Sequence, residues 1–220
     1  MGIRINANPP IMQRPERRSC LIQAVRDQFA RPTGRAGAMA GHLMALKNGR
    51  MNRFAVEVLN VQPADHVLEI GFGHGRTLGL LADRAEHGYV AGIDLSDVMV
   101  RQAAKRNLDR ILAGRVELCR GSVADLPFEY ARFDKVLAVN NYQFWPNAEL
   151  NLTEIQRVMR EGARLVLCLR LHSPGIFSIP GFTHQQLEET LGLLRWVGFS
   201  GITVEQRNLG REVACVVARR

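Results

Sequence analysis

The stretch VLEIGFGHG, residues 67–75, is the most informative part of this 220-residue chain. Its apolar start reads as a buried strand over residues 66–70, and glycines 71, 73 and 75 lead into a helical segment at 77–85. A glycine turn lets the backbone approach a ligand closely, because no Cβ stands in the way. The spacing is G-x-G-x-G, whereas pyrophosphate-binding turns have G-x-G-x-x-G, and Glu69 precedes the turn. That carboxylate would repel a pyrophosphate, but it suits a ligand that carries ammonium and sulfonium groups.

Strands and helices alternate after this turn. The patterning predicts further strands at 89–93, 116–120, 135–139 and 164–171, with helices at 96–112, 148–159 and 184–197. Such alternation implies right-handed βαβ units and a mostly parallel, doubly wound α/β sheet. The last two strands, 201–206 and 213–218, are joined through residues 208–211 with no room for a crossover helix, so they must pair antiparallel. The sequence therefore predicts a seven-stranded sheet with an antiparallel C-terminal strand.

The N-terminal part differs in charge and is predicted as a separate unit. Residues 1–53 carry ten Lys and Arg against two acids, whereas the rest has 19 of each, so the net charge of +8 lies in the first quarter. We expect a basic tail and a helical lid over residues 1–60, with helices at 16–29 and 39–59, and a ligand-binding domain over residues 61–220. The basic arm either steers toward nucleic acid, anionic lipid or an acidic substrate, or is a solvated extension.

Composition excludes several protein classes. Hydrophobic residues make up 46% of the chain, which is ordinary for a globular protein, and no apolar run approaches the roughly 20 residues of a membrane span. The four cysteines are widely spaced, which argues against a zinc site or a disulfide framework and fits a reducing cytoplasm. We expect no bound metal.

Polar residues follow the later strands as well. Asp94 ends the second predicted strand, and a carboxylate there can accept hydrogen bonds from both ribose hydroxyls of an adenosine. Segments 121–128 and 133–140 follow in turn. The loops at the carboxyl ends of parallel strands converge on one crevice, which is the expected ligand site in such folds.

Together these segments resemble the class I S-adenosylmethionine-dependent methyltransferases. Residues 161–165, EGARL, stand where that family often has a Pro-Gly-Gly turn, and the resemblance covers roughly residues 40–220. It is closest to the small-molecule branch that includes the ubiquinone and menaquinone methyltransferases. The resemblance implies a Rossmann-like fold, S-adenosylmethionine as cofactor and an N-terminal lid over it.

The resemblance also implies roles for residues of the cofactor site. Gly71 and Gly73 would lie beneath the methionine part, with Glu69 near its ammonium group. Asp94 would hold the ribose and Leu95 would pack against adenine. The remaining implied contacts are Phe72 in the turn, Ser122 and the backbone of Val123 at the adenine edge, and Asn140 facing the reactive methyl.

The sequence gives weaker signals for the residues that bind the methyl acceptor. Aromatic residues follow the fourth strand, and among them Tyr142 is expected to face the substrate, whereas Phe144 and Trp145 fit core packing equally well. The Asn/Asp-Pro-Pro-Tyr signature of many nucleic-acid methyltransferases is absent. His172 and His184 are candidate bases or structural residues.

We therefore predict methyl transfer to O, N or S of a small aromatic or heterocyclic metabolite. The alternatives are an RNA methyltransferase that uses the basic arm, and a binding module that has lost activity. The hypothesis of a NAD-dependent oxidoreductase has less support, because the third glycine is misplaced for a pyrophosphate-binding turn and Glu69 would repel the pyrophosphate. The oligomeric state stays open.

Overall fold

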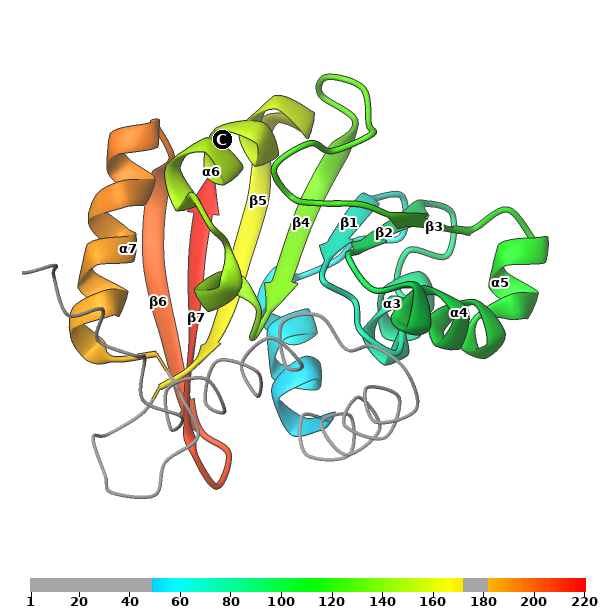
Figure 1. Ribbon diagram of the computed structural model, residues 1–220, viewed down its shortest axis with the longest axis horizontal. Helices are drawn as coiled ribbons and strands as arrows, with labels where there is room; N and C mark the ends of the chain where they lie inside the picture. The colour runs from blue at the N-terminus through cyan, green and yellow to red at the C-terminus, as the bar shows by residue number, and fades with distance from the viewer. Residues whose placement is uncertain (1–48, 172–181) are drawn as a thin grey trace, which may run out of the picture.

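The computed structural model describes residues 49–171 and 182–220 (Figure 1). In these ranges seven strands form one sheet: β1 (His66–Ile70), β2 (Tyr89–Asp94), β3 (Val116–Arg120), β4 (Phe133–Val139), β5 (Met159–Arg170), β6 (Ser200–Asn208) and β7 (Glu212–Arg219). The helices are residues 49–59, α3 (Arg76–Ala82), α4 (Asp97–Arg106), α5 (Leu108–Leu112), α6 (Ala148–Val158) and α7 (His184–Val197), with a short 3-10 helix η1 (Tyr142–Phe144).

The strand order is β3-β2-β1-β4-β5-β7-β6. β1 to β5 pair in parallel, whereas β7 is antiparallel to both of its neighbours, β5 and β6. The prediction of a Rossmann-like, mostly parallel seven-stranded sheet with an antiparallel C-terminal strand is confirmed. The short connection between β6 and β7 forces this reversal, because a parallel pairing needs a crossover segment.

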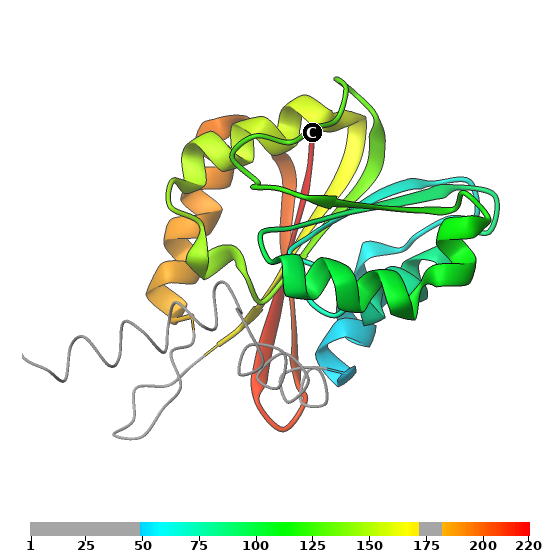
Figure 2. The same cartoon turned by 45° about the vertical axis from the view of Figure 1, so that its right-hand side comes forward.

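Helices cover both faces of the sheet (Figure 2). Residues 49–59, α3 and α4 pack on one face, and α6 and α7 pack on the other. β5 shows how one strand serves both layers: Leu165, Leu167 and Leu169 enter the core under α6 and α7, whereas Val166 and Cys168 enter the opposite core. This alternation is the two-residue period of a strand that is buried on both faces.

Two local predictions were wrong. The expected helix at 96–112 is broken at Asn107, whose side-chain amide donates to the Gly75 carbonyl oxygen at 2.9 Å and so ties α4 to the glycine turn. The expected turn at residues 160–162 lies inside β5, where Gly162 adopts a φ of 73°. The register shifts there from Phe133–Met159 to Lys135–Arg164, so the turn is a bulge in a longer strand.

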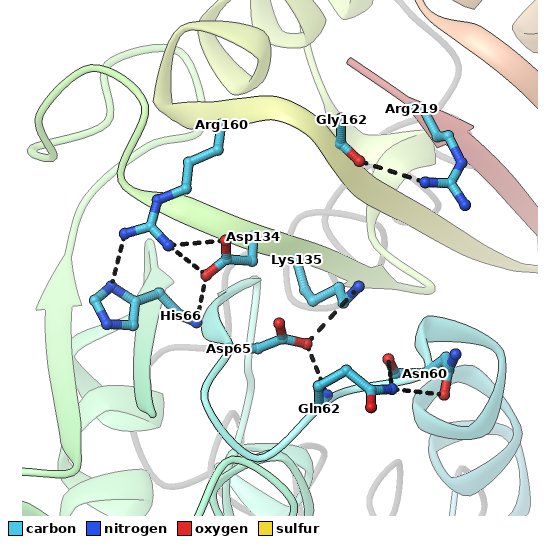
Figure 3. Close-up of polar contacts among 9 residues, drawn as sticks. All are labelled: Asn60, Gln62, Asp65, His66, Asp134, Lys135, Arg160, Gly162 and Arg219. Atoms are coloured by element: carbon cyan, nitrogen blue, oxygen red, sulfur yellow. Dashed lines mark hydrogen bonds and ion pairs between the residues drawn. The ribbon is translucent and has the colours of Figure 1, made fainter. Parts of the chain in front are cut away.

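Ion pairs fasten the amino ends of the central strands (Figure 3). The Asp134 carboxylate accepts from the backbone N–H of His66 at 2.8 Å and from Arg160 Nη1 at 2.6 and 2.8 Å. Burial acts to raise the pKa of Asp134, but the His66 N–H and the Arg160 guanidinium outweigh it, so the pKa is lowered. These contacts join β1, β4 and β5 at the end of the sheet where the strands begin.

The predicted lid is only partly covered by the structure. The helix expected at 16–29 and residues 39–48 of the one expected at 39–59 lie outside the described residues. Residues 49–59 contribute Met51, Phe54 and Leu59 to the core under α3. The division at residue 60 stays a prediction. In the described ranges, no helix is long and apolar enough to cross a membrane.

Candidate functional site

The glycine turn after β1 requires a backbone that glycine adopts readily. Gly71, Gly73 and Gly75 have φ values of 66°, 55° and 78°. A Cβ on Gly75 would lie 2.5 Å from the Cβ of Ala103, so this glycine allows α3 and α4 to pack closely. By contrast, no described atom lies within 4 Å of a Cβ built on Gly73. The turn therefore packs against protein at Gly75 and faces open space at Gly73.

Asp94 joins the end of β2 to this turn. Its Oδ2 accepts the N–H of Gly73 at 2.8 Å, and its Oδ1 accepts the N–H of Ser96 at 2.9 Å. Burial raises the pKa of Asp94, and these two hydrogen bonds offset only part of that effect. A carboxylate offers about four acceptor positions, so Asp94 can accept further hydrogen bonds from a ligand.

Glu69 is a buried carboxylate at the centre of the sheet, with an exposed fraction of 2%. Burial raises its pKa well above the usual range, a hydrogen bond with the Thr77 hydroxyl lowers it, and the charge of Asp94 raises it further. Its Oε2 has no hydrogen-bond partner among the described residues. An unpartnered buried carboxylate oxygen is costly for the fold, and a cationic ligand beside it would compensate that cost.

A cavity of about 260 Å³ opens next to the end of β2. It is lined by Leu95, Arg120, Gly121 and Ser122. Leu95 is 46% exposed and leaves an apolar surface available at the site. Phe72 and Val123 instead point into the core, so a ligand would meet their backbone rather than their side chains.

Two asparagines end β4 beside the glycine turn. Asn140 has a φ of 53° and donates its N–H to the Cys168 carbonyl at 2.7 Å. The Asn141 side-chain amide donates to the Ile70 carbonyl at 2.5 Å, and it fills the space that a Cβ on Gly71 would occupy. Asn141 was not among the residues expected from the sequence, although two consecutive asparagines at a strand end were a usable signal, since the first of them, Asn140, adopts the left-handed backbone that asparagine tolerates.

Comparisons with known proteins agree with this geometry. A family model described as a methyltransferase domain matches residues 67–162. The uncharacterized methyltransferase YdaC of Bacillus subtilis is 26% identical over 83% of this chain and 98% of its own length. The demethylmenaquinone methyltransferase of Lactiplantibacillus plantarum is 37% identical over 50% of this chain and 46% of its own length. These matches show that the chain is an S-adenosylmethionine-dependent methyltransferase, with its methyltransferase domain over residues 67–162.

A solved structure supports the fold of this methyltransferase. An S-adenosylmethionine-dependent methyltransferase from Aquifex aeolicus aligns with a TM-score of 0.63 at 19% identity, over 76% of this chain and 88% of that one. The predictions of a methyltransferase and of S-adenosylmethionine as its cofactor are confirmed. The chain spans almost all of YdaC but less than half of the demethylmenaquinone enzyme.

The residues at the carboxyl ends of the strands fit this cofactor chemically. S-adenosylmethionine carries an ammonium, a sulfonium and an adenosine. The unpartnered Oε2 of Glu69 suits a cation, and the remaining acceptor positions of Asp94 suit hydroxyl donors. The cavity beside Leu95 offers an apolar wall for a flat base.

Tyr142 lies in the core of the methyltransferase, with an exposed fraction of 7%. Its ring packs edge-on against Trp145 and Phe182, with centroid distances of 5.0 and 5.7 Å. Burial raises the pKa of its hydroxyl, which is hydrogen-bonded to Thr190. That Tyr142 faces the substrate stays a prediction.

The two histidines considered as candidate bases are His184, at the start of α7, and His172, which lies outside the described residues. His184 is exposed on α7, with its Nε2 3.3 Å from Glu212 Oε1. His172 falls in the undescribed range 172–181. His74, within the glycine turn, accepts the Arg76 N–H through Nδ1 at 3.3 Å.

Proposed function

We propose that this methyltransferase methylates O, N or S of a small aromatic or heterocyclic metabolite. The observation that carries the proposal is Trp145, a partly buried aromatic residue soon after β4 that packs on the ring of the buried Tyr142, which in turn packs on Phe182. A flat apolar acceptor would find a matching surface there.

The same proposal assigns roles to the cofactor residues. Glu69 binds the ammonium group, the backbone of Gly71, Phe72 and Gly73 lies under the methionine part, and Asp94 accepts the ribose hydroxyls. The other assigned contacts are Leu95, Ser122 and the Val123 backbone with adenine, and Asn140 with the methyl end. The unpartnered Glu69 Oε2, the open space at Gly73 and the cavity beside Leu95 support these roles.

When bound, S-adenosylmethionine supplies a methyl group on a positively charged sulfur. The task of the protein is then to hold the acceptor atom in line with that carbon and to keep water out. The hydrogen bond from Asn140 to Cys168 and the wedge of Asn141 against the glycine turn fix the backbone on which this alignment depends. A dedicated base is not required if the acceptor is a thiol, an amine or an acidic hydroxyl.

A direct experiment separates small molecules from RNA as acceptors. The purified full chain is incubated with S-adenosylmethionine labelled in its methyl group, together with a metabolite extract and, separately, with total RNA. Label in a small molecule identified by mass spectrometry is the expected result. Label in RNA would overturn the proposal and favour the basic arm as a phosphate-binding segment. Absence of label from both, with intact cofactor binding, would favour an inactive binding module.

A further inference from the structure

Helix α7 presents an exposed face on the outside of the molecule. Figure 1 shows α7 beside β6, at the far end of the sheet from β2 and β3. One side of the helix is buried, and it consists of Leu187, Thr190, Leu191 and Leu194. The opposite side has residues three and four positions apart that are all exposed, namely Gln185, Glu188, Glu189, Gly192, Arg195 and Trp196. These six residues are called the outer face of α7 below.

Trp196 is a large aromatic side chain that lies on this outer face with an exposed fraction of 78%. Its indole Nε1–H donates to Glu149 Oε1 of α6 at 3.1 Å, so the ring is held in place on the surface. Leu150, next to Glu149 in the chain, is also exposed, with a fraction of 64%. Tryptophan is enriched among the residues that dominate protein interfaces, and a side chain held before association loses little freedom on binding. The ring therefore fits a surface that another molecule covers.

Gly192 leaves an open space in the middle of the outer face. No described atom lies within 4 Å of a Cβ built on Gly192, so packing inside this part of the chain does not require a glycine there. A glycine in the interior of an exposed helix also lowers the stability of the fold relative to alanine. The distance between two packed helices depends on the side chains at their contact, so a glycine at that point lets a second helix come close.

The charges of the outer face follow an order that complements itself. Glu189 precedes Gly192 by three residues, and Arg195 follows Gly192 by three. A two-fold axis through Gly192, perpendicular to the helix, sets two copies of α7 antiparallel and brings residues equally distant from Gly192 face to face. Glu189 of one copy then meets Arg195 of the other, and Glu188 meets Trp196. Each of these contacts occurs twice in the pair.

We propose that two copies of this chain associate through the outer face of α7, as an antiparallel pair of helices that cross at Gly192. A second copy fits this face because the same helix supplies both charges of each ion pair. The contact leaves the cofactor end free, because α7 lies beside β6 whereas Gly73 and Asp94 follow β1 and β2, across the sheet. The inference concerns assembly and does not depend on which molecule accepts the methyl group.

The test measures self-association of the full chain by sedimentation equilibrium at increasing protein concentration. We expect a monomer–dimer equilibrium for the natural chain. Glu189→Arg and Arg195→Glu each replace two attractive contacts with two repulsive ones, so each should weaken the dimer about tenfold. The double variant with both substitutions restores opposite charges at the facing positions and should associate as the natural chain does.

A mixture of the two single variants separates this arrangement from other causes of weak association. After Arg195→Glu both facing positions are acidic, and after Glu189→Arg both are basic. An equal mixture should therefore form a heterodimer about as tight as the natural dimer, although each variant alone associates weakly. Recovery in the mixture would also show that neither variant is misfolded.

Two further variants serve as a steric test and a matched control. Gly192→Leu fills the crossing point and should abolish the dimer, whereas Arg101→Glu makes the same charge reversal on the exposed surface of α4 and should leave the dimer unchanged. A natural chain that sediments as a monomer at every concentration would overturn the inference. So would a dimer that both charge reversals and Gly192→Leu leave intact, because its interface would then lie on another surface.

Discussion

The two ends of the central strands use carboxylates in opposite ways. At the amino end, Asp134 accepts hydrogen bonds from Arg160 and the His66 N–H, and its pKa is lowered. At the carboxyl end, burial raises the pKa values of Glu69 and Asp94, and Glu69 Oε2 lacks a partner among the described residues. The charged form is stabilised by protein at one end and disfavoured at the other.

This contrast separates residues that stabilise the fold from residues arranged for a ligand. A buried acceptor without a partner lowers stability, and such groups persist where a bound molecule supplies the missing interaction. The two ends also hold a comparable pair of glycines, since Gly73 lies in the turn at the cofactor end and Gly162 in a bulge at the other, and a Cβ on either would meet no described atom within 4 Å. Matched substitutions at the two ends should therefore have different effects.

The glycine pair should show the largest effect. Gly73→Ala and Gly162→Ala both place a Cβ at positive φ with no described atom within 4 Å, so each should lower the free energy of unfolding by about 1–2 kcal/mol. Only Gly73→Ala adds a methyl group where the ligand is proposed to lie. Calorimetry should therefore show lost S-adenosylhomocysteine affinity for Gly73→Ala and unchanged affinity for Gly162→Ala. Equal affinities would remove Gly73 from the site.

The carboxylate pair should change stability in opposite directions. Glu69→Gln removes a buried charge and should raise the free energy of unfolding of the ligand-free protein by about 1 kcal/mol near neutral pH, while weakening S-adenosylhomocysteine binding. Asp134→Asn breaks the ion pair with Arg160. It should lower the free energy of unfolding by about 1 kcal/mol and leave the affinity for S-adenosylhomocysteine unchanged. Urea unfolding and calorimetry measure the two quantities. Destabilisation by both variants would contradict the contrast.

The free energy of unfolding should also depend on pH in different ways through Asp134 and Glu69, with smaller effects than the substitutions themselves. The folded pKa of Asp134 is lowered, so its stabilisation is present above the unfolded value of about 3.9 and is lost as the pH falls through the folded pKa. The folded pKa of Glu69 is raised, so its favourable contribution is present below the unfolded value of about 4.3 and is lost as the pH rises through the folded pKa.

Unfolding measured between pH 5 and 8 should therefore show different trends for the two variants. The advantage of Glu69→Gln over the natural protein should grow with rising pH, whereas the deficit of Asp134→Asn should stay constant. A constant advantage of Glu69→Gln across this range would contradict the raised pKa, because it would mean that Glu69 is ionised in the folded state as it is in the unfolded state.

Local signals predicted the fold and much of the cofactor end. The glycine turn, the strand and helix periodicity and the short 208–211 connection are all readable from neighbouring residues, and they predicted a mostly parallel seven-stranded sheet with an antiparallel C-terminal strand. The break at Asn107 was not readable in this way. Its cause is a hydrogen bond to the Gly75 carbonyl, 32 residues earlier in the chain.

Features that depend on contacts between distant segments escaped prediction. Asn141 matters because its amide meets Ile70 and Gly71, and the bulge at Gly162 exists because β5 continues pairing with β4. The position of Tyr142 after β4 predicts a place near the substrate, and the packing of its ring on Phe182 is a further contact that residue order does not give.

The central claim is that the carboxyl end of the sheet binds S-adenosylmethionine through acceptors that the protein leaves available. Calorimetric titration with S-adenosylhomocysteine of the natural chain, Asp94→Ala and Asp134→Ala tests it most directly. We predict saturable binding by the natural chain, a loss of about 1–3 kcal/mol for Asp94→Ala, the scale of hydrogen bonds to a charged group, and no change for Asp134→Ala. Equal affinity of all three proteins would contradict the claim.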